Sequence, residues 1–121
     1  MIVFGIMAGG AAGALARYVV DTLATSRYGH AFPWGILLIN ATGSALLGFL
    51  TGLGLHHGFP KTPEAILGTG FCGGYTTFST FAVDTVELAE AGTPGLAVRS
   101  VFANILLATV AAAAGLALAA L

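Results

Sequence analysis

Four long apolar segments account for most of this chain and limit what it can fold into. A helix that crosses a lipid bilayer needs about 20 mostly apolar residues, so four crossings use about 80 residues and leave about 40 for ends and short loops. The segments lack the alternating pattern of membrane-barrel strands. We therefore predict an all-α integral membrane protein with one four-helix transmembrane domain over residues 1–121. The segments run from Met1 to about Leu23, from about Pro33 to about Leu55, from about Pro63 to Ala91 and from about Leu96 to Leu121.

The scarcity of charge supports a membrane location. Hydrophobic residues make up 57% of the chain and charged residues 7%, whereas soluble domains carry about 25% charged residues. This composition argues against a soluble enzyme, a soluble binding domain and a disordered chain. No basic run is present to bind nucleic acid, and the single cysteine, Cys72, excludes an intrachain disulfide.

The few basic residues give a weak signal for orientation. With four spans, Lys61 lies on one side, while Arg27, with Arg17 and Arg99 near helix ends, lies on the other. Lys and Arg in short loops set membrane orientation, so this small bias permits insertion both ways round. An antiparallel dimer of identical subunits would then supply the inverted symmetry that many transporters encode in one chain. The alternative is a single orientation that the sequence marks weakly.

Glycines recur at helical spacing in the first two segments. Gly5, Gly9 and Gly13 form one stripe, and Gly43 and Gly48 belong to another. Small residues let membrane helices approach closely, so we predict tight helix packing at these positions.

The third segment contains a stretch, Gly70–Phe81, that is typical of an interrupted helix. Adjacent Gly73 and Gly74, followed by Thr76 and Thr77, are poor helix formers. An interruption survives at membrane depth only if protein or a cavity satisfies the freed backbone groups. Freed carbonyls can coordinate a small cation, and freed N–H groups can face an anion. The alternative is a continuous helix whose glycines only pack.

Aromatic and hydroxyl side chains follow this stretch. Phe78 and Phe81 are three residues apart and share a helix face. The positive edges of their rings can meet a small dehydrated anion, and Ser79 and Thr80 add hydroxyl donors. Such phenylalanines are more often core residues, and such hydroxyls often bond their own backbone.

Two asparagines and one arginine stand out in the apolar segments. A buried amide needs partners, so Asn40 is either an interhelical hydrogen-bonding residue or a pore-lining donor, and for Asn104 we favour the interhelical role. Arg17 either extends to the membrane surface or raises the anion concentration at a pore mouth. Asp21, four residues on, is placed to neutralise it partly.

The residues resemble the bacterial and archaeal fluoride channels of the Fluc (CrcB) family over essentially the whole chain. The four-helix layout matches, and the third of the sequence signatures is the most specific. The matching stretches are Gly9–Tyr18, Ile39–Ser44 with Leu46–Gly48, and Gly70–Phe81.

This resemblance implies an antiparallel, dual-topology homodimer with two fluoride pores in the plasma (inner) membrane of a prokaryote. It also implies a structural sodium ion at the centre, held by backbone carbonyls of Gly73 and Thr76. The family is not enzymatic, and Cys72 and Ser79 have no neighbouring histidine or carboxylate to activate them.

The resemblance also implies roles for pore residues. Arg17 corresponds to an arginine near the vestibule, while Ile36 stands where the family usually has a hydroxyl and Asp84 where it usually has glutamate. Residues expected in the pore are Asn40, the aromatic pair Phe78 and Phe81, and the polar-track residues Ser79 and Thr80.

The expected function is passive, selective export of fluoride down its electrochemical gradient. Neutral hydrogen fluoride crosses membranes and ionises inside the cell, which traps fluoride there. One alternative is a small dual-topology exporter that exchanges protons for cationic compounds. It needs a membrane-embedded carboxylate, and the first two segments offer only Asp21, near a helix end. Another alternative is a membrane scaffold subunit that transports nothing.

Overall fold

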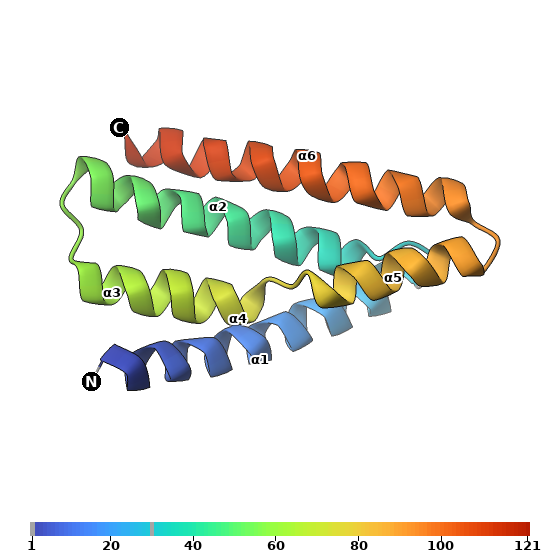
Figure 1. Cartoon of the computed structure of the whole chain (residues 1–121), viewed down its shortest axis with the longest axis horizontal. Coiled ribbons are helices and arrows are strands. Elements are labelled where there is room, and N and C mark those ends of the chain that lie inside the picture. Colours follow the sequence, from blue (N-terminus) through green and yellow to red (C-terminus); the bar gives the residue numbers. More distant parts are fainter. Residues whose placement is uncertain (1, 30) are drawn as a thin grey trace.

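The computed structural model describes residues 2–29 and 31–121, and this part of the chain is mostly helical (Figure 1). Met1, the expected start of the first apolar segment, lies outside the described residues. The helices are α1 (Ile2–Tyr28), α2 (Trp34–His56), α3 (Lys61–Ala65), the π-helix η1 (Ile66–Cys72), α4 (Gly73–Tyr75), α5 (Ser79–Glu90) and α6 (Pro94–Ala119).

Within the described residues, three helices are long and apolar enough to cross a membrane, namely α1, α2 and α6. The third expected segment differs because shorter helices share it. Helix α3, η1 and α4 follow one another without a gap, and α5 begins only at Ser79. The sequence pattern does not predict the π-helical hydrogen bonding of η1.

Helix boundaries differ from the expected segments at two places. Helix α1 continues past Leu23 to Tyr28, because the polar residues there also adopt helical geometry. The helix ends where a residue with a positive φ follows. Gly29 has a φ of 82°, and its N–H donates to the carbonyl of Thr25 at 2.9 Å, which closes the last turn of α1. Helix α6 begins at Pro94, a favoured first helical position for proline.

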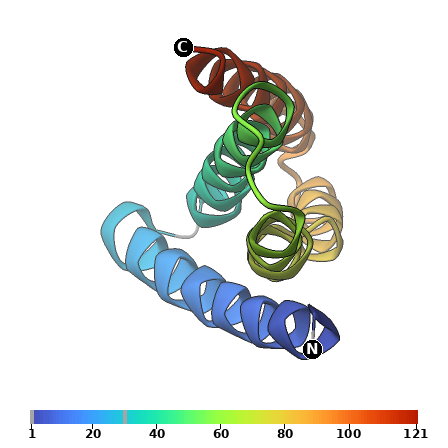
Figure 2. The same ribbon diagram turned by 90° about the vertical axis from the view of Figure 1, so that its left-hand side faces the viewer.

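Glycines bring the helices into close contact, as predicted. A Cβ on Gly48 of α2 would collide with the backbone carbonyl of Ala112 in α6, and a Cβ on Gly13 of α1 would collide with that of Phe71 in η1. Figure 2 shows α6 beside α2, with α1 on the opposite side of the bundle. Backbone contact of this kind requires residues without a side chain.

The buried core is small, and large apolar side chains cover the outside. Ile36, Ile39 and Tyr75 form the central cluster. By contrast, Phe4 is 71% exposed and Leu15 69% exposed. An exterior this apolar has an energetic advantage only in lipid or against another protein surface.

Candidate functional site

The candidate site is built around the interruption between α4 and α5. Thr76 leaves helical geometry, with φ −78° and ψ 158°. Its N–H and its hydroxyl both donate to the carbonyl of Cys72, at 2.9 and 2.8 Å. Gly73 and Gly74 lie before the interruption and remain helical. The helix therefore ends two residues after the glycine pair, at the β-branched threonines.

Asn40 of α2 binds the peptide groups that the interruption frees. The N–H of Thr77 donates to Asn40 Oδ1 at 3.0 Å, and Asn40 Nδ2 donates to the carbonyl of Thr77 at 3.1 Å. An asparagine amide carries the same donor and acceptor as a peptide group. One side chain thus replaces both helical partners that Thr77 has lost, as an apolar environment demands.

A second amide extends this hydrogen-bonded chain to α6. Asn40 Nδ2 also donates to Asn104 Oδ1 at 3.2 Å, and Asn104 Nδ2 donates to the carbonyl of Ser100 at 2.8 Å. Asn104 is 6% exposed. The prediction of an interhelical hydrogen bond for Asn104 is confirmed, and Asn40 makes such bonds as well.

Hydroxyl groups on both sides of the interruption lie within hydrogen-bonding distance of nearby polar groups. The N–H of Thr80 donates to Thr77 Oγ1 at 3.2 Å, so that hydroxyl satisfies one of the free N–H groups in the first turn. Thr77 Oγ1 lies 3.4 Å from Ser79 Oγ. On the other side of the interruption, the Tyr75 hydroxyl and Thr42 Oγ1 are 2.9 Å apart.

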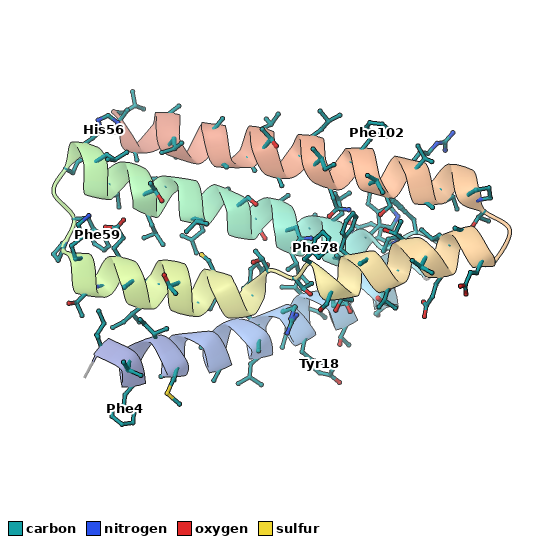
Figure 3. All side chains as sticks on the ribbon, viewed as in Figure 1. Phe4, Tyr18, His56, Phe59, Phe78 and Phe102 are labelled. Atoms are coloured by element: carbon teal, nitrogen blue, oxygen red, sulfur yellow. The ribbon has the colours of Figure 1, made fainter. Side chains whose placement is uncertain are left out.

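The two phenylalanines form a tilted pair with different surroundings. Their ring centroids are 5.9 Å apart at an interplanar angle of 55°. Phe81 packs against the core cluster, whereas Phe78 is 78% exposed in the single chain. Figure 3 shows Phe78 beside the interruption.

An open groove of about 700 Å³ runs along the interruption; we call it the break groove. Its described lining contains no charged side chain. The lining residues are Asn40, Gly43, Ser44, Leu47, Gly68, Thr69, Cys72, Gly73, Thr76, Thr77, Phe78, Phe81, Asn104, Ile105 and Ala108.

The break groove brings together part of the site expected from the sequence. Its lining includes the expected residues Asn40, Gly73, Thr76, Phe78 and Phe81.

Ser79, Thr80 and Arg17 are not part of that lining. Arg17 is half-buried on α1, and the expected pairing with Asp21 is wrong. Among the described side chains, the structure contains one ion pair, between Lys61 and Glu64, and it lies elsewhere. Asp21 turns instead toward Gly35, where a Cβ would collide with its carboxylate.

Asp21 therefore lies at the first turn of α2. The positive end of the helix dipole lies there and favours a carboxylate. This position, which sequence spacing on one helix does not reveal, accounts for the failure of the i, i+4 prediction.

The backbone carbonyls of Gly73 and Thr76, which are expected to bind sodium, meet the requirements of a cation site only in part. Because the Thr77 N–H donates to Asn40, it does not donate to the Gly73 carbonyl, its partner in a continuous α-helix. A Cβ on Gly73 would meet no atom within 4 Å, so the space around this residue is open. Two carbonyls from one chain are fewer ligands than a hard cation takes from oxygen donors.

Most of the chain matches a known protein family. The family described as CrcB-like protein, Camphor Resistance (CrcB), matches residues 4–116. The chain belongs to the CrcB family. Its interruption, break groove and two intramembrane asparagines all fall within the matched residues.

Relatives of this CrcB-family protein bear one functional name. The chain is 41% identical over 115 residues to Fluoride-specific ion channel FluC of Nitrobacter winogradskyi, covering 94% of this chain and 91% of the relative. It is 44% identical over 113 residues to Fluoride-specific ion channel FluC of Rhizobium meliloti, covering 92% and 90%. It is 49% identical over 90 residues to Fluoride-specific ion channel FluC 1 of Leifsonia xyli subsp. xyli, covering 74% of this chain and 66% of the relative.

CrcB membership and the three apolar helices make this chain a multi-pass membrane protein of a prokaryote, and a member of a non-enzymatic family.

Sequence reasoning missed three parts of the site: the peptide of Thr77 as partner of Asn40, the bond from Asn40 to Asn104, and the Ser100 carbonyl behind it. One signal was available. Asn40 and Asn104 are the two asparagines of the chain, and amides in apolar segments need partners.

Proposed function

We propose that this CrcB-family protein conducts fluoride passively and selectively, and exports it from the cytoplasm down its electrochemical gradient. The break groove carries the proposal: it is uncharged, and a primary amide, a freed peptide and two phenyl rings line it. The names of the relatives support the choice of fluoride over other small anions.

The groove offers weak donors rather than a fixed positive charge. A conducting site must bind its ion strongly enough to admit it and weakly enough to release it. Ring edges of Phe78 and Phe81 carry partial positive charge. Both N–H groups of Asn40 already donate, to the Thr77 carbonyl and to Asn104 Oδ1, so Asn40 would line the groove by holding the Thr77 peptide in place. The two rings would replace part of the hydration shell of a small anion without trapping it.

We propose that the chain crosses the membrane four times. Residues 61–75 and 79–90 lie end to end, the first part beside α2 and the second beside α6 (Figure 1). Their helices reach roughly 40 Å at 1.5 Å per residue, which exceeds the hydrocarbon thickness of about 30 Å. The interruption would then lie within the membrane.

We further propose an antiparallel homodimer with two pores. Phe78 is 78% exposed and the break groove is open in one chain, so a second copy would close it and complete the aromatic lining. The Gly73 and Thr76 carbonyls of the two copies would together hold one structural sodium ion between the subunits. Such an ion would supply positive charge that offsets carbonyls left without hydrogen bonds.

The test is efflux of fluoride from liposomes that contain the purified protein alone, measured with a fluoride electrode beside protein-free vesicles. We expect rapid fluoride efflux and little chloride efflux. Replacing one aromatic contact, worth about 0.5–1.5 kcal/mol, should slow a process that depends on it by up to about tenfold. We therefore expect Phe78→Ile to reduce efflux.

Asn40→Asp should reduce efflux further, because it replaces a donor with an oxygen that faces two other oxygens. The matched control is Phe102→Ile, since Phe102 is also exposed, at 60%, and lies on α6 outside the break groove (Figure 3). Unchanged efflux in both site variants would contradict these roles. Absence of fluoride efflux from the wild type would favour the scaffold alternative.

A further inference from the structure

The amide of Asn40 is held in one orientation from two sides. Its Oδ1 accepts the Thr77 N–H, and its Nδ2 donates both to the Thr77 carbonyl and to Asn104 Oδ1. Turning this amide by 180° would place Nδ2 against an N–H and Oδ1 against two oxygens. Each of these like-group contacts would lose a hydrogen bond and leave buried groups unpaired.

Asn104 is in turn held by its own helix. Its Nδ2 donates to the Ser100 carbonyl, one turn earlier in α6, at 2.8 Å. This bond fixes Asn104 Oδ1 toward α2. Residue 104 needs a donor for the Ser100 carbonyl and an acceptor for the Asn40 N–H. A side chain with acceptors only would place an oxygen against the Ser100 carbonyl, and the two oxygens would repel each other.

We propose that Asn104 is a positioning residue that sets the orientation of the Asn40 amide and, through it, the peptide of Thr77 at the interruption. Helix α6 thereby controls the geometry of the break groove, although Asn104 and Thr77 are not themselves hydrogen-bonded to each other. The link to conduction rests on the proposed fluoride channel function, whereas the link to Thr77 does not.

The distinguishing test is Asn104→Asp at different pH values. A protonated carboxyl group has the donor and acceptor of the amide and nearly its shape, so it can donate to the Ser100 carbonyl and accept from Asn40. An ionised carboxylate has no donor. Burial favours the neutral form, so ionisation requires a high pH. Cys72 is the one titratable side chain in the described groove lining; it is also present in the wild type, so each variant is compared with wild type at the same pH.

We expect fluoride efflux through Asn104→Asp to lie within about twofold of wild type near pH 5 and to fall about tenfold or more near pH 8, because an ionised carboxylate cannot donate to the Ser100 carbonyl and is repelled by it. Leak from protein-free vesicles is subtracted at each pH. Asn104→Leu, which can neither donate nor accept, should be slow at both pH values. The matched control Thr109→Val, on an exposed position of α6, should behave as wild type.

Hydrogen exchange at the Thr77 amide in lipid nanodiscs gives a readout that needs no conduction. We expect faster exchange at Thr77 in Asn104→Leu at both pH values, and in Asn104→Asp near pH 8 only. Thr77 exchange at the wild-type rate in Asn104→Leu would overturn the proposal, because leucine can neither donate nor accept at any pH. If wild type conducts no fluoride but Thr77 exchange follows this pattern, the proposed function fails and the positioning role stands.

Discussion

Replacing Asn40 with leucine tests the central bond of the site. The variant Asn40→Leu keeps the branched arrangement of heavy atoms but removes three hydrogen bonds, two to the peptide of Thr77 and one to Asn104. Interhelical hydrogen bonds in membranes contribute about 0.6 kcal/mol each, so three sum to about 2 kcal/mol. Unpaired buried peptide groups cost about 1–3 kcal/mol each, which gives about 6 kcal/mol as an upper figure for two. We expect the free energy of unfolding to fall by about 2–4 kcal/mol, or about 30- to 1000-fold in the equilibrium constant.

The assay is reversible unfolding in mixed detergent micelles, followed by circular dichroism. The matched control is Thr51→Val, an exposed position on the same helix, for which we expect a change below about 0.5 kcal/mol. Amide exchange at Thr77 is measured in parallel and should accelerate only in Asn40→Leu. If Asn40→Leu unfolds like wild type and keeps Thr77 protected, Asn40 does not hold the interruption, and the site must be explained differently.

Two further predictions concern packing and a second polar contact. Gly48→Ala places a methyl group against the backbone carbonyl of Ala112, which cannot rotate away, so we expect a loss of about 1–3 kcal/mol in the same unfolding assay. Gly95→Ala, where a Cβ would meet nothing within 4 Å, is the control, and equal stabilities would refute close α2–α6 contact. Tyr75→Phe removes the hydroxyl bonded to Thr42 and should cost about 0.5–1.5 kcal/mol. A matching loss in Thr42→Val, with no additional loss in the double variant, is expected, and full additivity would show that the two groups do not interact.

Hydropathy predicted the apolar segments well because the cost of exposing polar groups to lipid is a property of each residue and its neighbours in sequence. The segments at about 33–55 and 96–121 correspond closely to α2 and α6. Hydropathy ends the first segment at Leu23, five residues before the end of α1, since Thr25–Tyr28 is polar yet helical. Polarity indicates where a chain leaves the membrane, not where its helix ends.

The interrupted stretch shows the limit of local propensity. Gly73 and Gly74 mark a weak helix, but the chain departs from helical geometry at Thr76. Asn40, 37 residues away in sequence from Thr77, supplies the competing hydrogen bonds. No property of residues 70–81 alone contains that information.

For the candidate site too, the sequence and the tertiary structure each determined a different part. The amino-acid sequence by itself determined that the chain lies in a membrane, which segments are apolar, and that Asn40, Phe78 and Phe81 stand out among them. The tertiary structure decided which of these residues meet: it joined Asn40 to Thr77 and Asn104, left Ser79, Thr80 and Arg17 outside the groove lining, and turned Asp21 toward α2. The physical reason is that burial in lipid is additive along the chain, whereas a hydrogen bond needs two groups within about 3 Å of each other, and only the packing of distant helices brings them there.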